Sequence, residues 1–552
     1  MASLLETRRE QMFPKLTPAQ VGRLEGYGRR ARIRAGEVLV EPGERRGRIM
    51  VVLSGAIEVV LPGIAGETPV TVHTAGSFAG EMSSLRGVGA TVRARVRDDG
   101  EVIAIENEDL RRVVQEDAEL SEIFMRAFIL RRMGLIGAHQ GDVILIGSSH
   151  SADTLRLRQF LGRNGFPHVN LDVDRDPDVE ALLERFHVGC DEVPVVVCRG
   201  EDVLRNPTNA QVAECLRMNP EFDDTTVRDL IVIGAGPAGL AAAVYGASEG
   251  LDVLVLESTA PGGQAGTSSK IENYLGFPTG ISGQALAGRA FVQAQKFGAD
   301  VAVAGTVERL LCHRRPYRIE LAGGRVVHGR TIVVATGAEY RPIAIENLAQ
   351  FVGAGVYYAA THLEAQICRG EEVIVVGGGN SAGQAAAFLA ASCRHVHLLV
   401  RSSGLAATMS RYLIRRIEEN PNITLLPFTE ITSLAGNGQL ERVTWRTRGQ
   451  DEPGTCEVGH VFLMTGAVPN ARWLEGWVAL DERGFVRTGA DLRPEDLEAT
   501  RWPLARAPYL LETSRPGIFA VGDVRAGSVK RVAAAVGEGS AAVQFVHRAL
   551  QE

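Results

Sequence analysis

A chain of 552 residues is too long for a single domain of about 100 to 200 residues, so we expect three or four domains. Its 59 Lys and Arg and 66 Asp and Glu give a net charge of −7, and the charges form no long basic run. Nucleic acid is therefore disfavoured as a partner. With 45% hydrophobic and 23% charged residues, the composition excludes a disordered or collagen-like chain.

The first residues and the cysteines bear on location and metal binding. The start, MASLLETRRE, lacks the apolar run of a secretory signal, and no stretch approaches about 18 apolar residues, so we expect a cytoplasmic protein with no membrane partner. None of the cysteines is spaced as C-x-x-C, so we expect neither a disulfide framework nor a four-cysteine zinc site, and no metal. The seven cysteines are Cys190, Cys198, Cys215, Cys312, Cys368, Cys393 and Cys456.

The first 138 residues alternate short strand-like runs with Gly and Pro, which predicts a small β-barrel or roll flanked by helices. The exit helix is expected around Ile123–Ile136. The expected turns are Pro42-Gly43 and Ser54-Gly55. The expected strands are Glu37–Val40, Ile49–Leu53, Ala56–Leu61 and Val102–Ile105.

From residue 139 to 220 the pattern changes to that of a compact α/β unit. Three strands, VILIG, HVNLDVD and VPVVVC, alternate with helices. The expected helices are Asp153–Leu161, Val179–Phe186 and Ala210–Leu216. The polar stretch Asn219–Thr226 is the best linker candidate before the rest of the chain.

Two glycine-rich turns from strand to helix follow, and the first reads DLIVIGAGPAG over Asp229–Gly239. Glycines at 234, 236 and 239 allow a tight turn and close approach of the backbone to a pyrophosphate, and the helix N-terminus supplies N–H donors. A second strand ends at Glu257, which is placed to accept hydrogen bonds from ribose hydroxyls. The unit therefore predicts a dinucleotide site at Gly234, Gly236, Gly239 and Glu257.

An ordered series of further motifs resembles the thioredoxin reductase-like flavoproteins over Asp229–Glu552. The motifs are GGQ (262–264), ENYLGFP (272–278), ATGA (335–338), GGGNSA (377–382) and PGIFAVGDV (516–524). The resemblance implies FAD at the first site, a homodimer, an FAD domain over 226–347 and 467–552, and an inserted NADPH domain over 348–466. The FAD-binding residues that it implies are Gly263, Gln264, Asn273, Thr336, Gly337, Gly522 and Asp523.

The second glycine turn, EVIVVGGGNSA, predicts a nicotinamide dinucleotide site at Gly377, Gly379, Asn380 and Ser381. No carboxylate follows its second strand, because Val400 stands at that spacing, and Arg401 and Ser402 come next. A guanidinium and a hydroxyl suit a 2′-phosphate, so we expect NADPH rather than NADH. Arg401 as a solvated charge at a strand end is the alternative.

The redox dithiol of the thioredoxin reductases is missing. The resemblance places a C-x-x-C just before the second glycine turn, where this chain reads Ala359-Ala360-Thr361-His362. Because disulfide exchange needs a thiolate and a resolving partner, we expect electrons to pass from FAD directly to an acceptor. His362 and Glu364 are the candidate catalytic residues that line the pocket and supply a proton. Packing, or capping of a helix that begins near Thr361, is the alternative for both.

The α/β unit resembles a thioredoxin or glutaredoxin domain, with Pro194 at the family's cis-proline position. Its redox motif position reads Ser148-Ser149-His150-Ser151 and holds no cysteine, while Cys190 is a solitary thiol. We expect a degenerate domain that serves in docking or relay. Its loss of cysteines agrees with the loss at Ala359–His362.

Residues 16–114 resemble a cyclic-nucleotide-binding domain through EPGE (41–44), LSGAIEV (53–59), FAGEMSSL (78–85) and ATVRA (90–94). Gly80 and Glu81 match the family's ligand-binding Gly-Glu, but Val88 stands where the family has a phosphate-binding Arg. Losing that charged hydrogen bond costs about 1.5–3 kcal/mol. Arg86 or Arg93 could compensate, so cyclic-nucleotide binding and a ligand-free structural role both stay open.

The sequence thus predicts a multidomain fold with a β-roll cyclic-nucleotide-binding-like domain, a thioredoxin-like α/β domain and a Rossmann-like flavoprotein with two dinucleotide-binding domains. We expect an FAD enzyme that takes hydride from NADPH and passes electrons to an unidentified acceptor, regulated by the N-terminal domain. Three alternatives stay open. They are a disulfide reductase that uses other thiols, a ferredoxin, flavodoxin or quinone reductase, and a redox-sensing binding protein.

Overall fold

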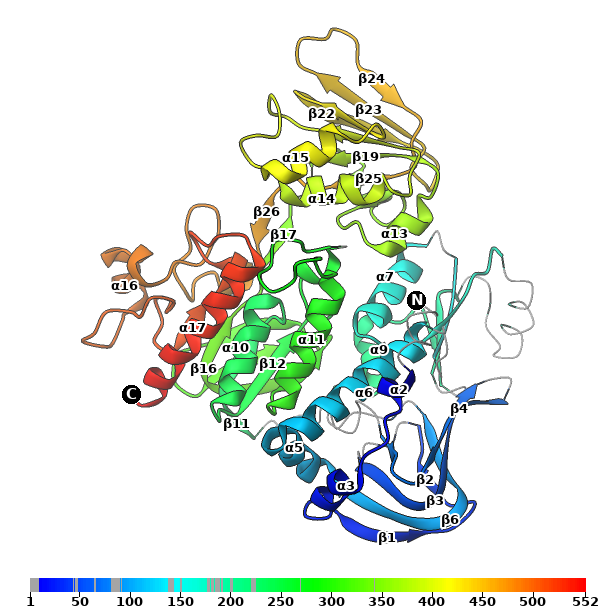
Figure 1. Ribbon diagram of the computed structural model, residues 1–552. Helices are drawn as coiled ribbons and strands as arrows, with labels where there is room; N and C mark the ends of the chain where they lie inside the picture. The colour runs from blue at the N-terminus through cyan, green and yellow to red at the C-terminus, as the bar shows by residue number, and fades with distance from the viewer. Residues whose placement is uncertain are drawn as a thin grey trace.

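The computed structural model in Figure 1 describes residues 9–552 except 43, 45–47, 64–65, 81–89, 91, 138–142, 149–150, 176–178, 180–182, 184–188, 190–191, 199–201, 220–224, 269 and 342. Its separate β-roll and α/β sheets confirm the expected multidomain fold class. No helix within the described residues is long and apolar enough to cross a membrane.

The N-terminal domain is a β-roll built around two long strands, β3 and β6. The predicted turn at Ser54-Gly55 is wrong, because β3 runs without interruption from Arg48 to Gly63. Gly55 has a φ of +79° at a point where the register with β6 shifts, so it forms a bulge rather than a hairpin. The other strands are β1 (Arg29–Ile33), β2 (Val38–Val40), β4 (Gly66–Thr74), β5 (Phe78–Ala79) and β6 (Arg93–Glu106).

Helices close one end of the roll. The exit helix is confirmed as α6, whose Phe124 and Phe128 pack edge-on against Phe78 of β5 in a fully buried cluster. Such aromatic pairs add about 0.5–1.5 kcal/mol beyond the burial of their area. The helices are α2 (Arg9–Met12), α3 (Pro18–Leu24), α5 (Asn107–Glu116) and α6 (Ala118–Gly137).

The α/β unit that was expected to be a thioredoxin-like domain has a four-stranded sheet in the order β10-β9-β7-β8. Its sequence predictions are confirmed at three strands and two helices, and the helix expected over Val179–Phe186 lies almost wholly outside the described residues. Strand β10 was missed, because DVLR carries little apolar signal. The elements are β7 (Val143–Ile146), α7 (Ala152–Arg163), β8 (Val169–Leu171), β9 (Val195–Cys198), β10 (Asp202–Arg205) and α9 (Asn209–Cys215).

The next domain holds the first glycine turn on a seven-stranded sheet of order β13-β12-β11-β16-β15-β14, with β27 beside β16. Helices α10 and α17 pack together over its core. The strands are β11 (Val227–Ile233), β12 (Val253–Glu257), β13 (Asp300–Val303), β14 (Val307–Leu311), β15 (Tyr317–Leu321), β16 (Val326–Val334) and β27 (Ile518–Ala520). The helices are α10 (Pro237–Ser248), η2 (Ala265–Thr267), α11 (Gly283–Lys296), η3 (Arg472–Leu474), η4 (Gly489–Asp491), α16 (Pro494–Thr500), η5 (Gly522–Val524) and α17 (Val532–Leu550).

The domain with the second glycine turn lies at the top of Figure 1 and is reached through a two-stranded ribbon, β17 (Ala338–Tyr340) and β26 (Ala467–Pro469). Its parallel sheet has the order β18-β25-β19-β20-β21, and a three-stranded sheet, β22-β23-β24, packs beside it. The strands are β18 (Val356–Tyr357), β19 (Glu372–Val376), β20 (His395–Leu399), β21 (Ile423–Leu426), β22 (Thr429–Ala435), β23 (Arg442–Thr447), β24 (Gly454–Cys456) and β25 (Val461–Leu463). The helices are α12 (Leu348–Phe351), α13 (His362–Ile367), α14 (Asn380–Leu389) and α15 (Arg411–Glu418).

The close packing of α10 on α17 gives a stability prediction. A Cβ at Gly539 would lie 2.1 Å from the carbonyl oxygen of Ala238, so Gly539→Ala forces the two helices apart. We expect a loss of about 1–3 kcal/mol of unfolding free energy and a melting temperature lower by several degrees. In the same helix, Gly537 has no atom within 4 Å of that position, so Gly537→Ala should raise the melting temperature. Thermal unfolding of both variants checks this, and equal shifts would contradict it.

Candidate functional site

The first glycine turn joins β11 to α10 and leaves an open face at its centre. A Cβ at Gly234 would lie 2.4 Å from the carbonyl oxygen of Ala335, and one at Gly239 would lie 1.8 Å from that of Gly234. Beside Gly236, the N-cap residue of α10, the nearest atom is Gly263 Cα at 4.0 Å. Gly234 and Gly239 are therefore needed for close backbone packing, and Gly236 leaves room for a phosphate at the helix N-terminus.

Glu257 ends β12 beside this turn and is buried. Its carboxylate accepts hydrogen bonds from the backbone N–H groups of Ala235 (2.7 Å), Thr259 (2.9 Å) and Ala260 (3.2 Å). A carboxylate offers about four acceptor positions, so these three donors leave one for a ribose hydroxyl. The arrangement fits the expected adenosine end of a dinucleotide.

Arg163 reaches this site from the C-terminal end of α7 in the thioredoxin-like domain. Its Nη2 donates to the carbonyl oxygen of Gly263 at 3.0 Å, and its Nε is buried with no hydrogen-bond partner. Burial lowers the pKa of the guanidinium, and the charge of Glu257 opposes that shift. A buried cation with a free donor suits a pyrophosphate. Sequence reasoning missed Arg163 because it lies in another domain, outside every glycine motif.

The other residues expected near the flavin surround the place where the ribbon leaves the domain. The amide of Gln264 donates to the carbonyl oxygen of Ala338. Thr336 Oγ1 donates to the carbonyl oxygen of Asn470 at 2.8 Å, and the carbonyl of Gly337 accepts from the N–H of Asn470 at 3.1 Å. Asn273 is exposed.

Gly522 and Asp523 form a short turn at the N-terminal side of α17. The N–H of Gly522 donates to a carboxylate oxygen of Glu538 at 2.7 Å, which fixes the turn on α17. Burial raises the pKa of the Asp523 carboxyl. Lys530 caps the turn by donating to the Asp523 carbonyl oxygen at 2.6 Å. The carboxylate of Asp523 stays available to a polar ligand such as a ribityl chain.

The second glycine turn repeats the geometry of the first. A Cβ at Gly377 would lie 2.3 Å from the carbonyl oxygen of Met464, whereas the Cβ position of Gly379, the N-cap residue of α14, has no atom within 4 Å. Asn380 Oδ1 accepts the N–H of Ser410 at 2.8 Å, and Ser381 is exposed. This turn also fits a dinucleotide phosphate.

Arg401 and Ser402 follow β20 at the rim of this turn. The Arg401 side chain is 75% exposed, and its Nε lies 4.0 Å from Oε1 of Glu430. Ser402 Oγ donates to the carbonyl oxygen of Gly404 at 2.7 Å, while Val400 is buried. The guanidinium is thus free to turn toward a phosphate or to remain in water.

Glu364 is held in α13 as a capping residue. Its Oε2 accepts from the Thr361 N–H at 2.8 Å and from the Thr361 hydroxyl, and its Oε1 accepts from Gln159 of α7 at 2.8 Å. The side chain is buried. This is the capping alternative that the sequence allowed, and a proton-donor role for Glu364 stays a prediction. The side chain of His362 lies outside the described residues.

Cys368 and Cys393 form a thiol pair that the sequence did not predict. Both are buried in the core of the domain that holds the second glycine turn. A hydrogen bond between the two thiols raises the pKa of Cys368 and lowers that of Cys393. Cys368 also donates to the carbonyl oxygen of Glu364 at 2.7 Å. The two cysteines were missed because they are far apart in sequence and form no motif.

The N-terminal ligand site is only partly described. The carbonyl oxygen of Gly80 accepts from Arg131 Nη1 at 2.6 Å, while Glu81, Arg86 and Val88 lie outside the described residues. Arg93 donates to Glu41 at 2.9 Å and also to Glu67. Arg93 is therefore already paired with two carboxylates and is a poor substitute for a phosphate-binding Arg.

At the thioredoxin-like redox position, Ser148 Oγ donates to Asp174 at 2.6 Å. Ser149, His150 and Cys190 lie outside the described residues. The expected cis bond before Pro194 is confirmed.

Comparisons with known proteins agree with this geometry. The pyridine nucleotide-disulphide oxidoreductase family model matches residues 228–539, and the cyclic nucleotide-binding domain model matches 30–117. Thioredoxin reductase of Mycolicibacterium smegmatis is 33% identical over 327 residues, 59% of this chain and 98% of that protein. That of Bacillus subtilis is 31% identical over 332 residues, 60% and 97%. A crystal structure of Lactococcus lactis thioredoxin reductase (FR conformation) shares 27% identity with a TM-score of 0.52, over 59% and 99% of the chains.

Two glycine turns, one on a mixed sheet and one on a parallel sheet, are typical of an oxidoreductase with two dinucleotide sites. The chain belongs to the pyridine nucleotide-disulphide oxidoreductase family, in its thioredoxin reductase-like branch, and also carries a cyclic nucleotide-binding domain. The expected cofactors, FAD and NADPH, are those of the thioredoxin reductases.

The two open glycines give a paired prediction. Gly236→Val places a side chain where only a cofactor phosphate has room, so flavin affinity should fall more than about tenfold, because a charged hydrogen bond is worth about 1.5–3 kcal/mol. Gly379→Val should instead weaken NADPH binding and leave the flavin content unchanged. Flavin absorbance per chain and NADPH titration of the oxidised enzyme measure the two effects. Loss of flavin in both variants would contradict the assignment.

Proposed function

We propose that this protein is an NADPH-dependent flavoprotein reductase that delivers electrons to an external acceptor without a C-x-x-C dithiol. The observation that carries the proposal is the pair of open turns at Gly236 and Gly379 on a chain that has Ala359–His362 at the dithiol position. When bound, FAD supplies a ring that accepts hydride from NADPH and releases electrons onward. No thiol at 359–362 can take those electrons.

The residues divide into those that bind and those that position. Backbone N–H groups at the start of α10 and α14 bind phosphates, and the helix dipoles favour the negative charge. Glu257 accepts from the ribose, and Arg163 adds a positive charge from the neighbouring domain. Gln264, Thr336 and Asp523 orient the flavin end by analogy with the family.

The choice of NADPH over NADH rests on Arg401 in this proposal. We expect Arg401→Leu to lower kcat/KM for NADPH about tenfold or more, because an ionic hydrogen bond worth about 1.5–3 kcal/mol is lost, and to leave the value for NADH unchanged. Arg442→Leu is the matched control, since Arg442 is an exposed arginine of β23. Steady-state kinetics with both nucleotides measure the ratio. An equal fall in kcat/KM with NADPH and NADH would show that Arg401 does not bind the 2′-phosphate.

A second candidate function, a disulfide reductase that uses other thiols, would depend on Cys368 and Cys393, which lie in the same core cluster. Both thiols are buried, with exposed fractions of 0% and 6%, so a protein disulfide can reach them only after movement of α13 or α14. We therefore rank this function below direct transfer to a quinone, ferredoxin or flavodoxin.

Anaerobic rapid mixing distinguishes these functions. The enzyme is reduced with NADPH and then mixed with a quinone, ferredoxin, flavodoxin, oxidised thioredoxin or an aromatic disulfide, while flavin absorbance is followed. We expect one of the first three to reoxidise the flavin more than about tenfold faster than either disulfide. The double variant Cys368→Ala/Cys393→Ala should behave as wild type, as should the control Cys312→Ala, a buried cysteine of the other nucleotide domain.

Fast reoxidation by a disulfide that disappears in the double variant would establish the second function instead. In the same series, His362→Ala should slow the proton-linked acceptors and should shift the pH dependence of their reaction. An unchanged pH profile would remove His362 as the proton donor and would leave the reductase assignment intact.

The N-terminal domain serves as a regulator in this proposal, with a cyclic nucleotide as its ligand. Its helices α5 and α6 lie against α11, where Lys296 donates to Ser121 Oγ at 3.1 Å, so a movement in the roll reaches the FAD domain directly. A ligand-free structural role and a redox-sensing binding protein remain the alternatives. We also retain a homodimer and a cytoplasmic location as expectations from the family and the sequence.

A further inference from the structure

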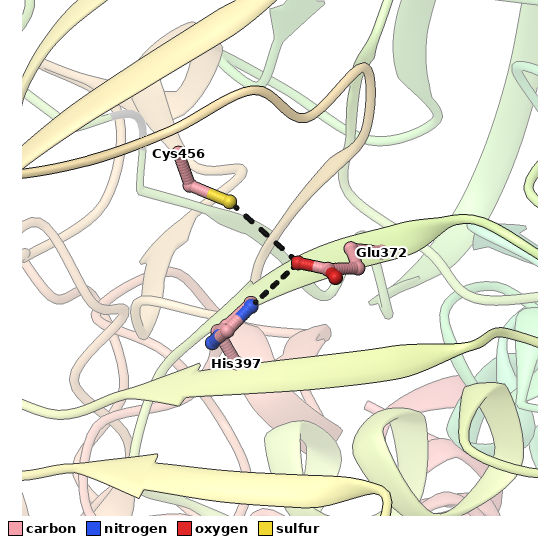
Figure 2. Close-up of side chains that lie close together, drawn as sticks. All are labelled: Glu372, His397 and Cys456. Atoms are coloured by element: carbon pink, nitrogen blue, oxygen red, sulfur yellow. Dashed lines mark hydrogen bonds and ion pairs between the residues drawn. The ribbon is translucent and has the colours of Figure 1, made fainter.

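Three potential metal ligands from distant parts of the chain meet in the NADPH-binding domain. Glu372 begins β19, His397 lies in the adjacent β20, and Cys456 ends β24 of the small three-stranded sheet (Figure 2). His397 Nε2 lies 3.2 Å from Glu372 Oε2, and Cys456 Sγ lies 3.7 Å from the same oxygen. All three ligand atoms are within 4.8 Å of one another.

These separations are those of ligands around one small cation. Zinc binds nitrogen and oxygen at about 2.0–2.2 Å and sulfur at about 2.3 Å, so tetrahedral angles put neighbouring ligand atoms roughly 3.3–3.7 Å apart. The separation of 3.7 Å lies at the upper limit of that range, and the separation of 3.2 Å lies just below its lower limit. An ion between the three atoms requires only small side-chain movements.

We propose that Glu372, His397 and Cys456 bind one divalent transition-metal ion, with zinc as the preferred metal. A thiolate, an imidazole and a carboxylate together suit zinc and exclude magnesium and calcium, which prefer oxygen ligands. Water completes the fourth position. The inference is independent of the proposed reductase function and replaces the expectation that the chain binds no metal.

The surroundings leave the shared oxygen open to a cation. Arg394 pairs with the other carboxylate oxygen, Oε1 of Glu372, at 3.2 Å, and its side chain is 69% exposed, so it can turn into water when a metal binds. His395 is turned to Thr424, with which its Nε2 shares a hydrogen bond of 2.8 Å. Glu457 adds a negative charge near Cys456. The three ligand residues are half-buried, which limits competition from water.

The position indicates a structural role. The glycine turn at Gly377 follows the carboxyl end of β19, whereas Glu372 lies at its amino end. The metal would therefore lie at the opposite end of the strand from the dinucleotide. Cys456 brings in the three-stranded sheet, which otherwise contacts the parallel sheet through apolar packing. The ion would tie the two sheets together.

Zinc binding to the full-length flavoprotein tests the proposal. After treatment with a chelator under reducing conditions, the protein is titrated with zinc against a chromogenic zinc chelator. We expect one tightly bound zinc per chain, and more than about tenfold weaker binding in Cys456→Ala and in His397→Gln, since each removes one ligand. The matched controls are Glu371→Gln and Cys215→Ala. Glu371 is a neighbouring carboxylate that pairs with His460, and Cys215 is a cysteine of another domain.

Cobalt substitution tests the site in the wild-type protein, so its result does not depend on whether the variants fold. One equivalent of cobalt added to the wild-type protein should produce absorption at longer wavelength than the oxidised flavin, with the intensity of a tetrahedral site, and an excess of magnesium should not reduce it. Flavin content should be equal in all samples. Wild-type protein that binds neither metal would overturn the proposal, as would zinc affinity retained in both ligand variants.

Discussion

Close approach of backbone to backbone at two strand ends is the constraint on which both nucleotide sites depend. Gly234 lies against the carbonyl of Ala335 because β11 and β16 are adjacent parallel strands, and Gly377 lies against that of Met464 because β19 and β25 are adjacent in the same way. No side chain fits at either point. The chain therefore turns tightly enough to present the first N–H groups of the next helix to a phosphate.

Much of this arrangement could be predicted from sequence because its signals are local. Buried strands that enter a glycine turn, followed by helices rich in small residues, identified both units and their order along the chain. The prediction of a turn at Ser54-Gly55 was wrong. Gly55 has a positive φ, but it forms a bulge inside a long strand. Strand β10 was missed because its own residues give no clear strand pattern. Its antiparallel pairing with β9 makes it a strand in the structure.

The contacts between domains had no sequence signal at all. Arg163 comes to the first dinucleotide site, and Gln159 to Glu364, only because α7 packs between two domains that are distant in sequence. The Cys368–Cys393 pair and the cluster of Glu372, His397 and Cys456 each lie within one domain, and they too lacked a sequence signal. Each joins residues whose separation follows from strand order, and no spacing rule describes them.

Helix α7 also limits how the two nucleotide domains can move. Gln159 of this helix donates to Glu364 in the domain of the second glycine turn, and Arg163 donates to Gly263 in the domain of the first. A rotation of one domain against the other must break at least one of these hydrogen bonds, because both start from one rigid helix. Each such bond contributes about 0.5–3 kcal/mol, the larger figure applying to charged partners, so the helix biases the orientation without locking it.

The segment at the expected dithiol position, Ala359–His362, lies beside one of these hydrogen bonds. Thr361 donates to Glu364, and Glu364 in turn accepts from Gln159, so the segment at and just after the expected dithiol position takes part in an interdomain contact. A redox dithiol must move between the flavin and the substrate. A contact that fixes the orientation of two domains must instead persist. In the proposed function, where electrons pass from the flavin to an external acceptor, this contact can stay formed, because no dithiol at residues 359–362 has to move.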